Sequence, residues 1–277
     1  MANFDFDQAE GLRRMLAGPR PRIVTFLSAT AQDDKGAMLV NLGASLARAG
    51  NDVVIVDACQ HEYGVAQRLG VDLGANLLNV ARQECGLNQV INAVPQGFSV
   101  ASMARKSMSR GGADEARRLA ATFDVLVQRS GIVIVDGEFG DGAGFPVPAM
   151  ASAEIVVQVS TSAASITAAY ALIKRLSQQL GRRPFGILVT GASEAEAKVV
   201  YDNMASAATR YLAVQLTSMG SVPADEYLHR AARLGRAVVD AFPLAGASVA
   251  FRRLAGRFAL PGMSQLGNAG GPTHFGH

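Results

Sequence analysis

Five short, largely apolar stretches with runs of valine and isoleucine constrain the fold of this chain more than any other feature. They span residues 22–27, 52–57, 132–136, 154–160 and 185–190, and shorter strand patterns lie at 98–103 and 214–219. Amphipathic helical patterns separate them, at 37–49, 65–69, 75–83, 113–130, 163–180, 193–210, 225–234 and 248–258. Strands that are apolar on both faces and alternate with helices are typical of a parallel sheet covered on both sides. We therefore expect an α/β fold with a doubly wound, mostly parallel sheet.

The two ends of the chain differ from this alternating core. Residues 5–17 carry a helical pattern of their own, in which Asp7 can act as N-cap and Glu10 can complete a capping box. The sequence Gly-Pro-Arg-Pro at 18–21 stops this helix, and the segment from Pro261 onward is rich in glycine, serine and asparagine. We expect three parts: an N-terminal helix and linker at 1–21, an α/β domain at 22–260 and a flexible tail at 261–277.

Composition excludes several classes of protein. The longest apolar runs are the length of strands and too short to cross a bilayer, and the first residues lack the pattern of a secretory signal. The two cysteines, Cys59 and Cys85, form no disulfide framework, so we expect a reducing cytoplasm. The net charge is only +3 and the basic residues are spread along the chain, so nothing in the sequence demands a nucleic-acid partner.

The segment between the first strand and the next helix, residues 28–36, lies where a phosphate-binding loop would be. It reads Ser-Ala-Thr-Ala-Gln-Asp-Asp-Lys-Gly. A Walker loop needs glycines whose amides approach phosphate, a lysine for the β- and γ-phosphates, and a serine or threonine for magnesium. Lys35 has the right position, but Asp33 and Asp34 replace glycines and Gly36 replaces the hydroxyl residue. Asp57 and Asp136 each follow an apolar strand, which is the Walker B pattern.

These ordered signals, together with Asp-Gln-Ala-Glu-Gly-Leu-Arg at 7–13, resemble the FlhG (FleN) family of flagellar-number regulators within the MinD/ParA group of deviant-Walker ATPases. The resemblance extends from residue 7 to about residue 259, and includes segments 40–47, 53–58 and 220–225. It implies a MinD-like P-loop fold with an added N-terminal partner-binding helix.

The resemblance also implies a partner for that helix. In the family, the motif D-Q-A-x-x-L-R stimulates the GTPase of FlhF, a signal-recognition-type protein that places the flagellum. Gln8 would then enter the catalytic site of the partner, and Asp7, Ala9, Leu12 and Arg13 would hold the helix against it. The same resemblance implies contacts with flagellar C-ring proteins or a flagellar transcriptional activator, a homodimer, and a location near the flagellar base at the cell pole.

The departures from the family pattern concern ATP. Of the family loop S-G-K-G-G-x-G-K-[ST], only the first serine and Lys35 are present, and Thr30 replaces the signature lysine. Cys59 replaces the second carboxylate of the switch motif D-x-D, and Thr190 replaces an asparagine that contacts adenine. We therefore expect a vestigial ATP site formed by Lys35, Asp57 and Asp136. No catalytic residue, metal site or cofactor is expected, unless the altered loop still binds ATP and magnesium.

Two other functions remain open at this point. The chain could be an active ATPase with an atypical loop, or a ParA-like protein that binds DNA non-specifically through its paired arginines. The helix at 248–258 has Phe251, Leu254 and Phe258 on one face and arginines largely on the other. Such a helix can lie on an anionic membrane. We expect instead that it packs on the core, that membrane contact is weak or indirect, and that Cys59 is a buried structural thiol.

Overall fold

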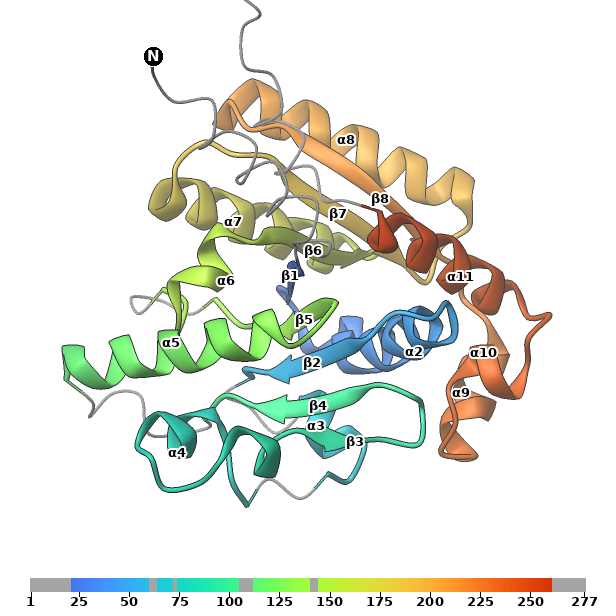
Figure 1. The fold of residues 1–277 in the computed structure, drawn as a ribbon. Helices are drawn as coiled ribbons and strands as arrows, with labels where there is room; N and C mark the ends of the chain where they lie inside the picture. The colour runs from blue at the N-terminus through green and yellow to red at the C-terminus, as the bar shows by residue number, and fades with distance from the viewer. Residues whose placement is uncertain (1–20, 60–63, 72–73, 105–111, 140–143, 261–277) are drawn as a thin grey trace, which may run out of the picture.

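The computed structural model describes residues 21–59, 64–71, 74–104, 112–139 and 144–260, and its elements form three layers (Figure 1). The middle layer is a single eight-stranded sheet in the order β3-β4-β2-β5-β1-β6-β7-β8. Every neighbouring pair is parallel except β3 and β4. The strands are β1 Arg22–Ser28, β2 Val53–Asp57, β3 Asn92–Ala93, β4 Ser99–Ser102, β5 Ile132–Asp136, β6 Glu154–Ser160, β7 Phe185–Thr190 and β8 Leu216–Val222. The expected α/β class with a mostly parallel sheet is confirmed.

Helices cover both faces of the sheet. One face carries α2 Lys35–Arg48, α3 Val65–Arg68, α9 Glu226–Arg233, α10 Val238–Ala241 and α11 Gly246–Ala259. The other carries α4 Leu77–Ala81, α5 Ala113–Gln128, α6 Pro148–Ser152, α7 Ala163–Leu180 and α8 Glu194–Leu212. The central strands are apolar on both sides because both faces are buried. In β5, for example, Ile132 and Ile134 pack toward α2 while Val133 and Val135 pack toward α5.

Several element bounds differ from the sequence-based expectations. The helix expected at 75–83 is only α4, because Asn76 caps its first residue and Gln83 has a φ of 64°. The strand expected at 214–219 is shifted to β8, which pairs with β7 and contains an irregularity beside Leu188. The short elements β3, α6 and α10 were not predicted. The N-terminal helical pattern and the expected tail lie outside the described residues.

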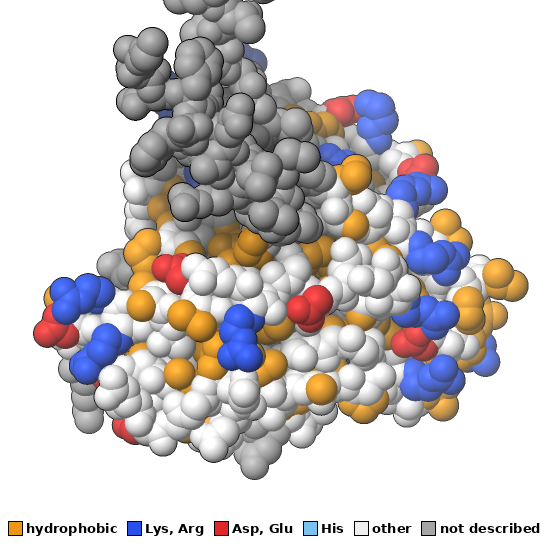
Figure 2. Space-filling view, in the orientation of Figure 1, with side chains coloured by type: hydrophobic (Ala, Val, Ile, Leu, Met, Phe, Trp, Pro, Cys, Tyr) orange, Lys and Arg blue, Asp and Glu red, His pale blue; other side chains and the backbone are white. Residues whose placement is uncertain are grey.

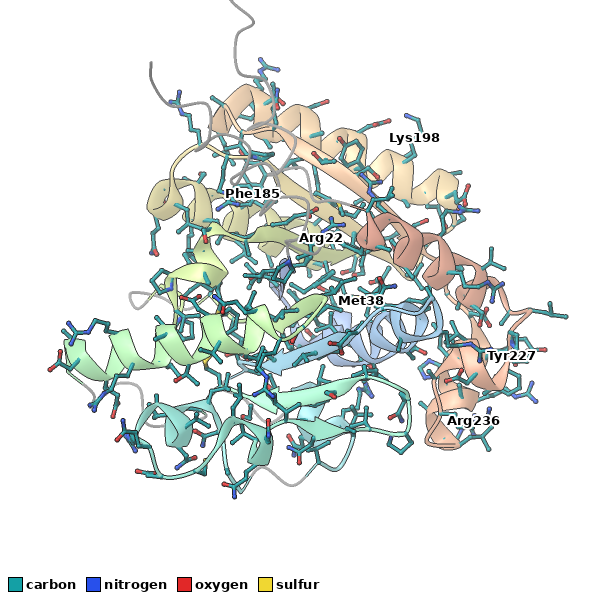
Figure 3. All side chains as sticks on the ribbon, in the orientation of Figure 1. Arg22, Met38, Phe185, Lys198, Tyr227 and Arg236 are labelled. Atoms are coloured by element: carbon teal, nitrogen blue, oxygen red, sulfur yellow. The ribbon has the colours of Figure 1, made fainter. Side chains whose placement is uncertain are left out.

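Arg22 joins the first strand to the last helix. Its guanidinium donates to the backbone carbonyls of Arg257, Phe258 and Leu260 at 3.0, 2.7 and 2.6 Å. It also pairs with Glu154 of β6 at 2.5 Å and lies 5.1 Å from the centre of the Phe258 ring (Figure 3). The apolar face of α11, with Phe251, Leu254 and Phe258, is buried. The expectation that this helix packs on the core is confirmed.

The described surface visible in Figure 2 carries charges of both signs, scattered among hydrophobic side chains. Among the helices that the structure describes, none has both the length and the apolar character needed to cross a membrane.

Candidate functional site

The carboxyl ends of β1, β2 and β5 meet in the centre of the sheet, because β5 lies between the other two strands. Asp57 and Asp136 are register partners at the last positions of β2 and β5. Lys35, the first residue of α2, follows β1 through a short 3₁₀ turn at Ala31–Asp33. The structure therefore brings together the three residues of the expected vestigial site, as the topology of a parallel sheet requires.

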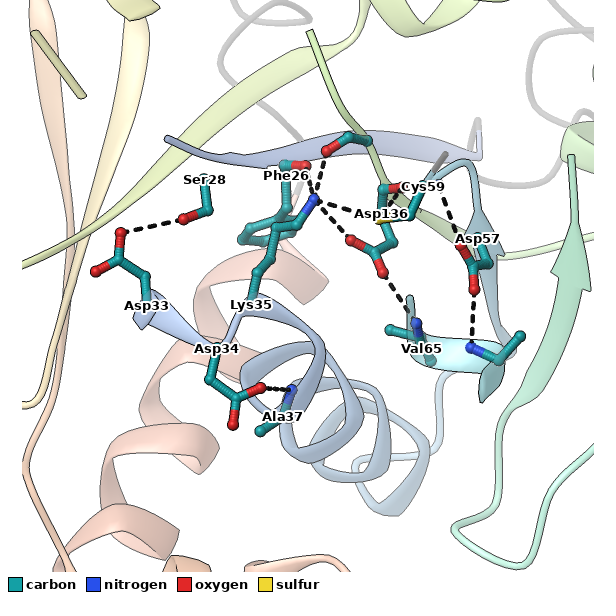
Figure 4. A network of polar contacts seen from close by, with 12 residues as sticks. Phe26, Ser28, Asp33, Asp34, Lys35, Ala37, Asp57, Cys59, Val65 and Asp136 are labelled. Atoms are coloured by element: carbon teal, nitrogen blue, oxygen red, sulfur yellow. Dashed lines mark hydrogen bonds and ion pairs between the residues drawn. The ribbon is translucent and has the colours of Figure 1, made fainter. Parts of the chain in front are cut away.

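The Lys35 ammonium lies among the carboxyl ends of β1 and β5, close to Phe26 and Asp136 (Figure 4). Its Nζ forms an ion pair with Oδ1 of Asp136 at 2.7 Å, and the two side chains are 10% and 0% exposed. It also donates to the backbone carbonyls of Gly137 and Phe26 and lies 3.9 Å from Sγ of Cys59. Lys35 thus has internal partners on all the strand ends that surround it.

The surroundings raise the pKa of both Lys35 and Cys59, which keeps the lysine charged and the thiol neutral. Burial by itself lowers the pKa of Lys35, but the acidic groups around it, led by Asp136, together outweigh burial, so the net pKa is above its ordinary value. Burial raises the pKa of the Cys59 thiol far above its ordinary value, more than the nearby lysine can lower it. Cys59 is therefore a buried neutral thiol, which is the structural reading expected from the sequence.

The two strand-end carboxylates also accept hydrogen bonds from the start of α3. The amide of Val65 donates to Oδ2 of Asp136 at 3.0 Å, and the amide of Ala66 donates to Oδ2 of Asp57 at 3.0 Å. Gly64 makes this approach feasible, because a Cβ added there would lie 2.2 Å from Oδ2 of Asp57. No sequence pattern indicated this role for Gly64.

The two acids of the loop have separate internal roles. Asp33 is 8% exposed, and its Oδ2 accepts from the hydroxyls of Thr30 at 2.7 Å, Ser165 at 2.9 Å and Ser28 at 3.1 Å. Asp34 has left-handed backbone angles, φ 46° and ψ 55°, and its side chain caps α2 by accepting from the amide of Ala37. Both carboxylates belong to the loop, but the structure buries Asp33 and uses Asp34 as a helix cap.

A pocket of about 1020 Å³ lies above this network. Its walls include Thr30, Gly36, Cys59, Phe139, Leu172 and Arg175, so the loop, the strand ends and α7 all contribute. Arg68 of α3 pairs with Asp34, and both residues line the same pocket. The pocket is large enough for a small molecule, and its lining combines apolar side chains with charges.

The donor set near the strand ends does not suit magnesium. One ligand atom each from Asp57, Cys59 and Asp136 lies within 4.8 Å of the others. The Lys35 ammonium lies against Asp136 and near Cys59, where it supplies the positive charge that a cation would bring. A neutral thiol is a poor ligand for magnesium, which prefers oxygen. The residues present therefore do not fit the magnesium of a Walker-type site.

The remaining residues singled out from the sequence lie in different places. Thr190, at the end of β7, accepts a hydrogen bond from the side-chain amide of Gln158 at 3.2 Å. Gln158 also donates to the backbone carbonyl of Asp33, so it supports the loop from β6. No sequence signal distinguished Gln158 from the other residues of its strand. The residues expected to bind a partner, Asp7, Gln8, Ala9, Leu12 and Arg13, lie outside the described residues.

The chain is similar to a known protein in sequence and to several solved structures in fold. No protein-family model matches the chain. The chain is 31% identical over 219 residues to a protein named Antiactivator FleN from Pseudomonas aeruginosa PAO1, and the match covers 78% of each protein.

The structural matches are more distant in sequence. The MinD cell division protein of Aquifex aeolicus matches with a TM-score of 0.65 at 17% identity, covering 85% of this chain and 95% of that one. The septum site-determining protein MinD from Pyrococcus horikoshii, solved with Mg-ADP, matches with a TM-score of 0.63 at 16% identity, covering 90% and 98%. A ParA family ATPase from Chlorobium tepidum gives 0.63 at 15% identity, covering 84% and 98%. At these identities the structural matches bear on the fold alone.

Proposed function

The chain belongs to the FleN family and has the MinD-like P-loop NTPase fold, and from this premise we propose that it regulates flagellar number or placement without hydrolysing ATP. It acts as a pseudo-ATPase whose scaffold is retained for protein contacts. The nucleotide site has lost its chemistry, so neither ATP nor magnesium controls it.

One observation carries the non-enzymatic part of the proposal: carboxylates of the chain engage the groups that would otherwise bind phosphate. Asp136 pairs with Lys35, and Asp34 caps the N-terminus of α2. The carboxylate of Asp33 accepts hydrogen bonds from the hydroxyls of Ser28, Thr30 and Ser165. The lysine, the helix N-terminus and the hydroxyls of the loop therefore already have anionic partners, and a phosphate would have to displace those partners.

The cost of that displacement is large compared with the affinity of a typical nucleotide site. Breaking a buried ion pair so that a charge is left without a partner costs about 3–5 kcal/mol. A site of micromolar to millimolar affinity has a total binding free energy of about 4–8 kcal/mol. Removing Lys35 from Asp136 would consume most of this, so useful binding of MgATP is not expected.

The regulatory contact in this proposal is made by the N-terminal helix. The motif Asp-Gln-Ala-Glu-Gly-Leu-Arg at 7–13 supports it. Gln8 enters the active site of an FlhF-like GTPase and orients the attacking water, as glutamine side chains do in GTPases. Asp7, Ala9, Leu12 and Arg13 hold the helix on the partner. The α/β domain then serves as the body that connects this helix to other components.

The named relative supports a second candidate function. That protein is called an antiactivator, and its match to this chain covers 219 residues, most of the α/β domain included. By analogy, this chain would bind a flagellar transcriptional activator and suppress it, with or without a homodimer. Contacts with C-ring proteins would belong to the same set of protein interactions.

GTP hydrolysis by FlhF tests the proposed contact directly. We expect the full-length chain to raise the turnover of FlhF, and Gln8→Ala to abolish that stimulation. Arg14→Ala is the matched control, because Arg14 lies in the same predicted helix but outside the motif. Absence of stimulation by the wild-type chain would refute the role of the helix.

Calorimetry with MgATP tests the non-enzymatic part separately. The pocket beside Lys35 is the observation that favours the opposite view, an active ATPase with an atypical loop. We expect no binding tighter than about 100 μM, a threshold that corresponds to about 5.5 kcal/mol. Tighter binding with ATP turnover would establish the active ATPase instead.

A further inference from the structure

The turn between α10 and α11 presents the most exposed large hydrophobic side chain of the described residues. Leu244 is 95% exposed, whereas the other exposed apolar residues range from 43% to 68%. Pro243 beside it is exposed as well, and Phe242 is half-buried. The Phe-Pro-Leu sequence at 242–244 therefore forms an apolar projection rather than a groove. We call residues 242–244 the apolar tip.

Four arginines surround this tip and bind the backbone or rings beneath it. Arg252 donates to the carbonyl of Pro243 at 2.8 Å, and Arg236 donates to the carbonyl of Asp240 at 3.0 Å. Arg48, from α2, pairs with the carboxylate of Asp240. Arg230 lies over the Phe242 ring, 5.2 Å from its centre. All four arginines are exposed, so each guanidinium is held at the surface near the tip.

The base of the tip is fixed to the core. The amide of Val238 donates to Oδ1 of Asn41 in α2 at 2.7 Å. Val238 and Val239 are buried, and so is Ala245 on the other side of the tip. The rings of Tyr227 and Phe242 lie 4.7 Å apart and join α9 to the tip. Because its base is anchored on both sides, the tip can present Leu244 with little loss of conformational entropy on binding.

The surface around the tip is positively charged. From residue 225 to residue 260 the chain carries six arginines and three acids, Asp225, Glu226 and Asp240. Asp240 is paired with Arg48, and Asp225 accepts from the amides of Tyr227 and Ala247. Figure 2 shows basic side chains alternating with hydrophobic ones along the edge formed by α9 to α11, and Figure 3 places Tyr227 and Arg236 on that edge. An anionic partner is therefore favoured.

We propose that the apolar tip and its arginines form a contact site for an anionic lipid surface. Leu244 and Pro243 enter the boundary between headgroups and acyl chains, and Arg48, Arg230, Arg236 and Arg252 bind lipid phosphates. Guanidinium groups match phosphate oxygens with two parallel hydrogen bonds, and apolar side chains flanked by basic ones suit the interface of an anionic bilayer. A planar surface fits a convex tip, whereas a peptide ligand needs a groove to fill.

This contact differs from membrane binding by the apolar face of α11, because that face is buried against the core. It is also separate from the nucleotide pocket, since none of the tip residues lines that pocket. The proposal therefore goes beyond the proposed function, and either can fail without the other.

Co-sedimentation of the full-length chain with vesicles tests the proposal. We expect binding to vesicles of phosphatidylcholine and phosphatidylglycerol in equal parts, weaker binding at high salt, and little binding to phosphatidylcholine alone. Leu244→Ser should weaken binding about tenfold. Arg236→Gln and Arg252→Gln should each weaken it about fivefold. The matched controls are Val199→Ser, 60% exposed on α8, and Arg117→Gln, whose side chain is 80% exposed on α5.

A fluorescence measurement locates the contact within the molecule. The chain contains no tryptophan, so Leu244→Trp introduces a single reporter. We expect its emission to shift to the blue with the anionic vesicles and to stay unchanged with phosphatidylcholine alone. Val199→Trp should give no shift with either. The proposal is overturned if the vesicles do not bind, if Leu244→Ser binds as the wild type does, or if the Leu244→Trp emission does not shift. Equal binding to vesicles with and without phosphatidylglycerol would overturn it as well.

Discussion

The substitution Lys35→Met tests whether Lys35 is a structural residue of this protein rather than a ligand for phosphate. Methionine keeps much of the length and the apolar stem of the side chain but removes the ammonium. Asp136, whose side chain is fully buried, then loses its ion-pair partner at 2.7 Å. Oδ2 of Asp136 keeps the amide of Val65, so the carboxylate is left partly compensated.

The expected cost follows from this geometry. Removing one partner of a buried ion pair destabilises a protein by about 3–5 kcal/mol, because the remaining charge stays buried. Lys35→Met should lower the free energy of unfolding by that amount, which corresponds to a fall in Tm of about 6–20 °C for a chain of this length. If Lys35 served only to bind phosphate, its replacement would leave the free energy of unfolding nearly unchanged or raise it.

Urea unfolding followed by circular dichroism measures this loss. The double variant Lys35→Met with Asp136→Asn provides the control, because asparagine can still accept from the amide of Val65 but carries no charge. We expect the double variant to be more stable than the sum of the single effects predicts, with a coupling energy of about 2–3 kcal/mol. The stabilisation by the raised pKa of Lys35 is fully present below pH 10.5, so measurements near pH 7 report all of it.

The structural interpretation of Lys35 is wrong if Lys35→Met unfolds within about 1 kcal/mol of the wild type, which is the range of many exposed ion pairs. It is also wrong if the effects of the two substitutions simply add. Either result would mean that the lysine is free to leave Asp136, and an active nucleotide site would then regain support.

Three further predictions concern the same region. Gly64→Ala should destabilise the protein by about 2–3 kcal/mol, because the new Cβ would lie 2.2 Å from Oδ2 of Asp57; Gly86→Ala, with open space around it, should stay near the wild type in the same urea assay. Asp33→Ala should cost more than Asp34→Ala, about 3 against about 1 kcal/mol, because Asp33 holds three hydroxyls in the interior while Asp34 is an exposed helix cap. Because the pKa of Cys59 is raised in the folded protein, above pH 9.0 this thiol ionises only in the unfolded state. The free energy of unfolding should therefore fall by about 1.4 kcal/mol per pH unit above pH 9.0. Cys59→Ala should remove this slope in unfolding curves measured between about pH 8 and pH 10.

The layered fold follows from local patterns, and this explains why the sequence was sufficient for it. The runs Ile132–Val135 in β5 and Ile155–Val157 in β6 are continuously apolar, as expected for strands that are buried on both faces. Elements without such a pattern were missed. The helix α10 has four residues, too few to show a helical period, and its place is fixed by the bond from Val238 to Asn41, far away in sequence.

The internal partners of the candidate site could not be predicted for a related reason. Asp33 and Asp34 are adjacent and identical in the sequence, yet one is buried and the other exposed. The difference depends on Ser165 of α7 and Gln158 of β6, which reach Asp33 only in the folded chain. The lysine and the two strand-end carboxylates were found because parallel strands place their carboxyl ends together. No sequence pattern shows which of those groups pair with one another.

The guanidinium of Arg22 has a consequence for synthesis of the chain on the ribosome. Its acceptors are the carbonyls of Arg257, Phe258 and Leu260, so the first strand of the sheet cannot complete its contacts until the last helix has been made. Folding of the nascent chain therefore stays incomplete until nearly the whole domain has emerged. The same hydrogen bonds hold the two ends of the described domain together, because Arg22 lies at its start and Leu260 at its end.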